Sequence, residues 1–88
     1  MKHIFVINPA AGKGKKLPAI LSAITYACEE LEVEFEIYHT RTVGDGIRFV
    51  SETCKEYPDM IKRFYACGGD GTLFEVLNGA VGHENTEV

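Results

Sequence analysis

The sequence has little cysteine, little proline and no tryptophan. Its 88 residues include three cysteines and three prolines. Because Cys28, Cys54 and Cys67 are odd in number and widely spaced, they predict neither a disulfide framework nor a Cys-x-x-Cys zinc site. The three histidines also lack metal-ligand spacing. We therefore expect no metal ligands among these residues, and we expect the cysteines to be buried in a reducing compartment.

Long apolar runs and an excess of positive charge are missing as well. The apolar run from Ile4 to Ile7 is ended by Asn8-Pro9, too early for a signal peptide or a membrane span, so we expect a cytoplasmic location. The formal net charge of -4 argues against binding to nucleic acid. The one basic cluster consists of Lys13, Lys15 and Lys16. Its charge fits equally well a solvated loop and a loop that faces phosphate.

Hydrophobic patterns predict three strands that alternate with three helices. Strands are expected at 3–7, 33–39 and 63–67, which are rich in β-branched and aromatic residues. Helices are expected where apolar residues recur at helical spacing, over 17–31, 47–57 and 72–81. The order βαβαβα predicts an α/β fold with a three-layer parallel sheet of the Rossmann or flavodoxin type.

The alternating pattern of the second strand predicts its place in the sheet. Apolar and acidic residues alternate over 33–39, as in a half-solvated edge strand, so the expected order is 2-1-3. Right-handed crossovers then place the first two helices on opposite faces, with a ligand site where the chain reverses direction. Because the sequence stops just after the third helix, we expect the sheet to be incomplete.

A glycine-rich segment, Gly68 to Thr72, joins the third strand to the third helix. Its glycines allow backbone to approach an anion, and the free amide groups of a helix N-terminus attract phosphate. Asp70 repels phosphate unless it holds Mg²⁺ or accepts a hydroxyl proton. A tight turn in which Asp70 bonds local amides is the structural alternative.

A second glycine-bearing loop, Asn8 to Lys16, leads from the first strand into the first helix. It contains two glycines and three lysines, and it would face the first glycine segment across the switch point. It is not a Walker A loop, because the glycine and Ser/Thr positions of that motif are not matched. The pair of loops nevertheless predicts a nucleotide phosphate site.

Glu75 has two competing interpretations. Thr72 and Glu75 have the spacing of a capping box, in which a hydroxyl and a carboxylate bond the free amides of a helix N-terminus. The alternative is that Glu75 contacts a bound nucleotide. Both interpretations stay open at this stage.

Taken together, these motifs resemble the diacylglycerol kinase catalytic domain superfamily, which includes soluble bacterial lipid kinases and sphingosine kinases. The resemblance covers nearly the whole chain and rests on N-P-x-x-G-x-G after the first strand, a Thr after the second, and G-G-D-G-T followed by Glu. It implies that ATP, with Mg²⁺, is bound by Asn8, Gly12, Thr40, Gly68, Gly69, Asp70, Gly71, Thr72 and Glu75.

The resemblance also implies what the protein does and what it needs. It implies transfer of the ATP γ-phosphate to a lipid hydroxyl such as that of diacylglycerol, in phospholipid metabolism. Residues 1–88 would be a partial ATP-binding domain, and a carboxyl-terminal domain would hold the lipid, touch the membrane surface and supply the general base. Asp70 is the one catalytic candidate within the chain, the isolated chain is expected to be inactive, and a homodimer stays open. Ala11 and Phe74 depart from the family pattern, which often has Ser and a polar residue there.

Two other functions compete with a lipid kinase. NAD kinase also uses G-G-D-G-T but resembles the chain less over Asn8 to Gly14. The third interpretation is a non-catalytic interaction module with the same fold, in which the glycine segments are only tight turns.

Overall fold

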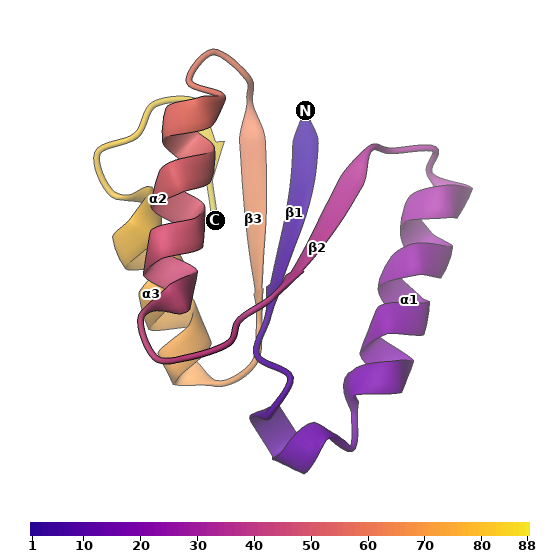
Figure 1. Cartoon of the computed structure of the whole chain (residues 1–88). Helices are drawn as coiled ribbons and strands as arrows, with labels where there is room; N and C mark the ends of the chain where they lie inside the picture. Colours follow the sequence, from indigo (N-terminus) through magenta and orange to yellow (C-terminus); the bar gives the residue numbers. More distant parts are fainter.

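The computed structural model, which describes residues 1–11 and 13–88, is a parallel sheet with helices on both faces (Figure 1). A 3₁₀ turn, η1 (Ala11–Gly14), precedes the first helix. The strands are β1 (Lys2–Ile7), β2 (Phe35–His39), β3 (Lys62–Cys67) and β4 (Thr86–Glu87). The helices are α1 (Leu17–Glu30), α2 (Asp45–Glu56) and α3 (Asp70–Ala80).

The sheet order is β2-β1-β3-β4, with every pair of neighbouring strands parallel. The predicted α/β class, the order 2-1-3 and the edge position of β2 are therefore confirmed. The fourth strand was not predicted, because its two residues lie in a polar segment without an apolar run. It is held at Lys62, whose amide N–H donates to the Asn85 carbonyl at 2.8 Å.

The two faces of the sheet carry separate apolar clusters, as right-handed crossovers require. On one face α2 and α3 cover Ile4, Val6 and Phe64. On the other face α1 covers Ile7, and the predicted inward face of β2 packs there as well. In Figure 1 the two layers lie on either side of the strands, α1 on the right and α2 with α3 on the left.

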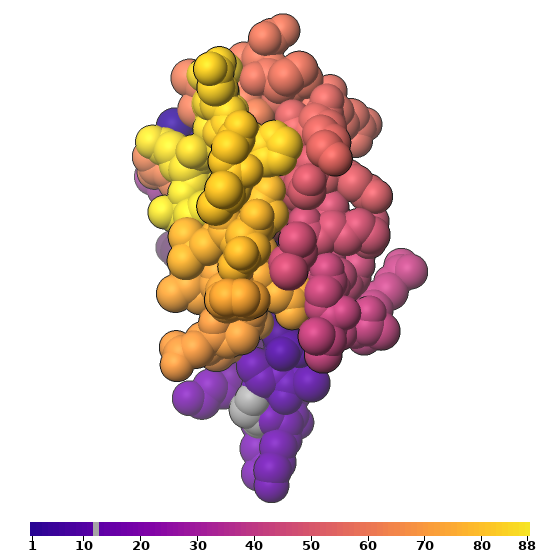
Figure 2. Space-filling view, turned by 90° about the vertical axis from the view of Figure 1, so that its left-hand side faces the viewer, coloured from indigo at the N-terminus to yellow at the C-terminus, as the bar shows by residue number. Residues whose placement is uncertain are grey.

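Figure 2 looks onto the face covered by α2 and α3, which lie side by side along their length. The segment after β1, drawn in dark purple, protrudes beyond their lower ends. In a parallel sheet of this kind, the strands end and the following helices begin at the same edge. This edge therefore brings together three strand-to-helix connections: β1 to α1, β2 to α2 and β3 to α3.

The buried polar groups outside that edge have partners. Lys62 is fully buried, and its ammonium donates to the carbonyl oxygens of Tyr57 and Met60, both at 2.7 Å. These two bonds hold the turn between α2 and β3 in place. The position of the ammonium is favourable because carbonyls at a helix C-terminus attract a cation. Cys28 and Cys54 are buried as predicted, whereas Cys67, at the end of β3, is only half-buried.

Candidate functional site

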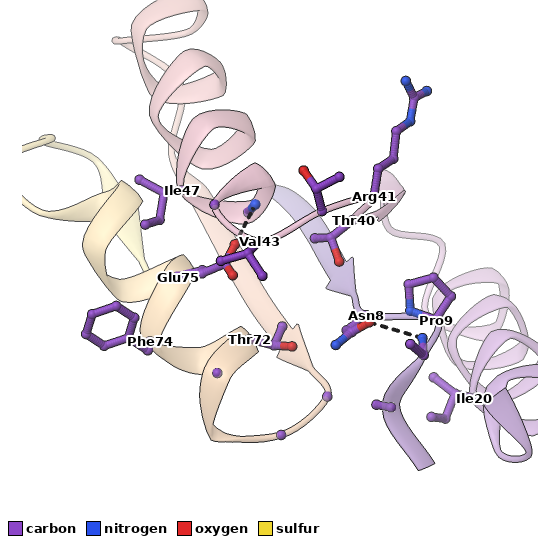
Figure 3. A pocket seen from close by; sticks show the side chains of 18 of the residues that line it. Asn8, Pro9, Ile20, Thr40, Arg41, Val43, Ile47, Thr72, Phe74 and Glu75 are labelled. Carbon is purple, nitrogen blue, oxygen red and sulfur yellow. Dashed lines mark hydrogen bonds between the residues drawn. The ribbon is translucent and has the colours of Figure 1, made fainter. Parts of the chain in front are cut away.

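A cavity of about 1090 Å³ opens at the carboxyl edge of the sheet (Figure 3). Its lining comes from the two predicted glycine loops and from a third segment, 40–44, which joins β2 to α2. The first turn of α2 contributes Gly46 and Ile47, and the second turn of α3 contributes Phe74 and Glu75. The cavity therefore lies at the predicted switch point, between three strand-to-helix connections.

Gly68, Gly69 and Gly71 line the cavity and play different parts. A side chain at Gly68 would collide with the Thr72 hydroxyl and would lie 3.3 Å from the Asn8 Cβ, so this position needs glycine for packing. A Cβ at Gly69 or Gly71 would meet no described atom within 4 Å. These two glycines therefore leave open space where a bound molecule can approach the backbone.

The first turn of α3 starts one residue after Gly69, not at Thr72. Gly69 is its N-cap, and no described side chain caps this end. Asp70 is exposed in the first turn and is not among the described residues that line the cavity. Thr72 is 7% exposed and does line it.

The β1–α1 loop forms the opposite side of the cavity. The Asn8 carboxamide oxygen accepts the Ala10 N–H at 3.0 Å, which shapes the loop start and holds Asn8 toward the cavity (Figure 3). Lys16 is the N-cap of α1 and lines the cavity, whereas Lys13 and Lys15 are exposed outside it. Gly12, predicted to bind ATP, lies outside the described residues.

Thr40 comes from the end of β2 and is held against β1. Its amide N–H donates to the Ile7 carbonyl at 2.9 Å, and its hydroxyl donates to the same oxygen at 3.4 Å. Thr40 lines the cavity together with Asn8 from the neighbouring strand end. The structure therefore brings together the predicted residues Asn8, Thr40, Gly68, Gly69, Gly71, Thr72 and Glu75.

Of the two interpretations of Glu75, the structure contradicts the capping box of α3. Glu75 does not turn back to the start of its own helix; its Oε1 accepts the Gly46 N–H of α2 at 2.8 Å (Figure 3). A Cβ at position 46 would lie 2.9 Å from that oxygen, so Gly46 makes room for the carboxylate. Glu75 thus caps the neighbouring helix and lines the cavity.

The β2–α2 loop is organised by Asp45, which sequence reasoning missed. Its Oδ2 accepts the Arg41 N–H at 2.9 Å and the Tyr38 hydroxyl at 2.8 Å, and its Oδ1 accepts two guanidinium hydrogens of Arg48. Hydrogen bonding to Arg48 holds the pKa of the Asp45 carboxyl below its ordinary value of 3.8, against the opposing effect of burial. Burial, with the bond to Asp45, raises the pKa of Tyr38. Aspartate at the start of a helix was the available signal.

The described residues contain neither a cluster of metal-binding side chains nor a helix that could span a membrane. No group of three or more His, Cys, Asp or Glu side chains there is placed to hold a metal ion. No helix in the same part of the chain is long and apolar enough to cross a bilayer.

Two solved structures resemble this chain, each of a "putative diacylglycerol kinase from Bacillus anthracis str. Sterne". One is 29% identical with a TM-score of 0.68 and covers 99% of this chain. The other is 31% identical with a TM-score of 0.59 and covers 89%. The chain spans 28% and 26% of their lengths, respectively. No curated protein matched.

A family profile decides the classification. The profile described as "Diacylglycerol kinase catalytic domain" matches residues 2–88, which is nearly the full length. The match includes both glycine loops and the β2–α2 connection that surround the cavity. The chain therefore belongs to the diacylglycerol kinase catalytic domain family.

Proposed function

We propose that this chain is the ATP-binding part of a lipid kinase that transfers the ATP γ-phosphate to a lipid hydroxyl such as that of diacylglycerol. The observation that carries the proposal is one cavity shared by both glycine loops at the carboxyl edge of the sheet. Its volume of about 1090 Å³ is ample for a nucleotide.

The triphosphate is expected between the two glycine loops. Gly69 and Gly71 leave backbone accessible on one side, and Lys16 adds a positive charge on the other. Neither α1 nor α3 has its N-terminus covered by a described side-chain cap. Both helix dipoles therefore favour an anion there, and Mg²⁺ bound to the phosphates would offset the negative charge of Asp70 in the first turn of α3.

The base and ribose are expected at the end of the cavity between α2 and α3. There the Glu75 carboxylate already bonds the Gly46 amide and would repel phosphate. The same carboxylate has a second oxygen that can accept a hydrogen bond from a ribose hydroxyl or a base amino group. Ile47 and Phe74 add apolar surface for the base.

Magnesium and the lipid acceptor are assigned as follows. Because the described residues hold no ready metal cluster, we expect Mg²⁺ to arrive on the triphosphate as MgATP. Asp70, exposed beside the glycine loop, is the candidate within this chain for a catalytic role. We propose that the lipid site, the membrane contact and the general base lie in parts of the protein outside these residues, because the solved relatives are more than three times longer.

Calorimetric titration with MgATP tests the nucleotide site. We expect the native chain to bind, and we expect Gly69→Val to abolish binding without unfolding, because a side chain there meets no described atom of the protein. Asp59→Val, an exposed change in the loop between α2 and β3, is the matched control and should bind like the native chain. Absence of binding by the native chain would favour the interaction module.

A second assay separates the two kinases. The natural full-length protein, given labelled ATP with diacylglycerol vesicles and NAD, should label the lipid. We favour the lipid over NAD because the N-P-x-x-G-x-G pattern of the first loop, Asn8 to Gly14, resembles lipid kinases more than NAD kinase. Label found in NADP alone would reverse the assignment.

A further inference from the structure

A cluster of charged and aromatic side chains sits behind the β2–α2 loop, outside the cavity itself. Asp45 is its centre and is only 9% exposed. Its carboxylate joins the end of β2, through Tyr38, to the loop, through Arg41, and to α2, through Arg48. We call this group, Tyr38, Asp45 and Arg48, the Asp45 clasp.

The clasp is braced on both sides. The Tyr38 ring stacks on Phe49 of α2, with centroids 3.8 Å apart and planes at 2°. Arg48, besides its bonds to Asp45, donates to Glu52 one turn further along α2 and to the Tyr38 hydroxyl at 2.8 Å. Two guanidinium nitrogens thus bond one carboxylate oxygen, Oδ1, while Oδ2 is held by Arg41 and Tyr38, so both oxygens of Asp45 are fixed in place.

The loop held by the clasp is a cavity wall. Residues 40–44 all line the cavity, and the first two residues of α2 after Asp45, Gly46 and Ile47, line it as well. Asp45 closes this loop twice: its carboxylate accepts the Arg41 N–H, and its own amide donates to the Thr42 carbonyl at 3.1 Å. Val43, between these ties, is 98% exposed, so packing does not hold the loop.

The clasp therefore acts on one end of the cavity. The loop and the first turn of α2 adjoin Glu75, at the end that repels phosphate. The triphosphate region lies between the two glycine loops, and Thr40, the loop residue beside it, is held by the Ile7 carbonyl of β1 rather than by the clasp. A change in the clasp should move the wall near the base and ribose and leave the phosphate region in place.

We propose that Asp45 is a positioning residue, which through Arg41 and Arg48 sets the loop 40–44 for recognition of the nucleoside part of the nucleotide. The inference rests on the proposed ATP site. According to this proposal, the clasp strengthens the binding of a nucleoside triphosphate but not that of an inorganic triphosphate. Asp45 itself contacts neither.

Calorimetry with two probes tests this role. MgATP and magnesium tripolyphosphate are titrated into the native chain and into Asp45→Asn, which keeps the shape and an acceptor for Arg41 but loses the ion pair. The ATP affinity should fall roughly fivefold to tenfold, the scale of one net hydrogen bond, while the tripolyphosphate affinity changes less than about twofold. Arg48→Lys should give the same split, because a lysine has a single donor nitrogen and cannot replace the two guanidinium nitrogens that bond Asp45 Oδ1.

The matched control is Arg63→Gln, which breaks the exposed Arg63–Glu87 pair at 2.9 Å near the other edge of the sheet. It should leave both affinities unchanged. In the chain without ligand, hydrogen exchange of the Arg41 amide should be faster in Asp45→Asn, because a neutral amide oxygen accepts this bond more weakly than a carboxylate, while amides of β1 keep their protection.

The outcomes separate the two proposals. Equal losses for both probes, or no loss for either, would overturn the positioning role and leave the ATP site standing. Failure of the native chain to bind either probe would overturn the ATP site, and the positioning role with it.

Discussion

Helices α2 and α3 lie side by side and both begin at the cavity, yet their N-termini differ. Both helices carry an aspartate in the first turn, Asp45 in α2 and Asp70 in α3, but α2 also receives a carboxylate from its neighbour: Glu75 of α3 accepts the Gly46 N–H. The start of α3 follows Gly69 with no described side-chain cap. One amide at the α2 N-terminus is therefore bonded by a carboxylate of the protein, whereas no described side chain bonds the amides at the α3 N-terminus, which can meet an anion.

The comparison teaches how one cavity acquires two chemically different ends. A helix N-terminus attracts negative charge in either case, but a carboxylate that is already bound excludes a phosphate. Glu75 belongs to α3 and closes α2, so the two helices can differ only because they are packed against each other. The difference is thus a tertiary property.

The largest expected effect comes from the packing that brings α2 and α3 together. A Cβ at Gly79 of α3 would lie 2.8 Å from both the Ile47 carbonyl oxygen and the Val50 Cβ of α2. Gly79→Ala should therefore lower the free energy of unfolding by about 1–3 kcal/mol, measured by urea denaturation. It should also weaken ATP binding, because Glu75 and Gly46 move apart.

Gly71→Ala is the matched control in the same helix. Its Cβ meets no described atom within 4 Å, so stability should stay level or rise by up to about 1 kcal/mol, as alanine is the better helix former. ATP binding should still fall, since the methyl group enters the cavity. Equal destabilisation by the two substitutions would contradict the close packing of α2 on α3.

Removing the carboxylate that closes α2 should have a smaller effect. Glu75→Ala is expected to lower the free energy of unfolding by about 1 kcal/mol, the usual cost of a lost N-cap, and Glu75→Gln by less because the amide oxygen still accepts. Thermal unfolding by circular dichroism measures both. Glu29→Ala, exposed on α1, should stay within about 0.5 kcal/mol of the native chain.

The smallest expected effect is a dependence of stability on acid pH through Asp45. Hydrogen bonding to Arg48 lowers the pKa of this carboxyl in the folded chain below its ordinary 3.8. The folded pKa is the lower one, so the stabilisation is present above about pH 4 and is lost as pH falls through the folded pKa. Because Arg48 is half-exposed, solvent and salt weaken the effect.

Urea denaturation between pH 5 and the acid limit of folding measures this dependence. In Asp45→Asn the curve of stability against pH should be flatter over that range, with the same dependence above it. Identical curves for the two proteins would show that Asp45 keeps its ordinary pKa in the folded chain.

Much of the fold was predictable because it follows from local patterns. The apolar run in β1, with Ile4 and Val6 buried on one face and Ile7 on the other, indicated a central strand. The alternation in β2 indicated an edge strand, and handedness then fixed the helices on opposite faces. The two residues of β4 carry no such pattern, and only pairing with β3 makes them a strand.

The site was partly predictable for the same reason. Glycines after β3 and a loop with lysines after β1 were predicted to meet, the family resemblance added a threonine after β2, and their described members line one cavity. Local spacing failed at Glu75, because a capping box and a contact to another helix have the same sequence signature. It also missed Asp45, whose partners Tyr38 and Arg48 lie on different elements.

By itself the sequence determined the alternation of strands and helices, the order of the first three strands and the positions of the glycine loops, since periodicity and glycine content act locally. Only the tertiary structure decided which helix N-terminus remains open. That depends on the approach of α3 to α2 at Gly79 and Gly46, which carries the Glu75 carboxylate to an amide 29 residues away in the chain. A hydrogen bond of 2.8 Å between separate helices is set by packing, which no local pattern encodes.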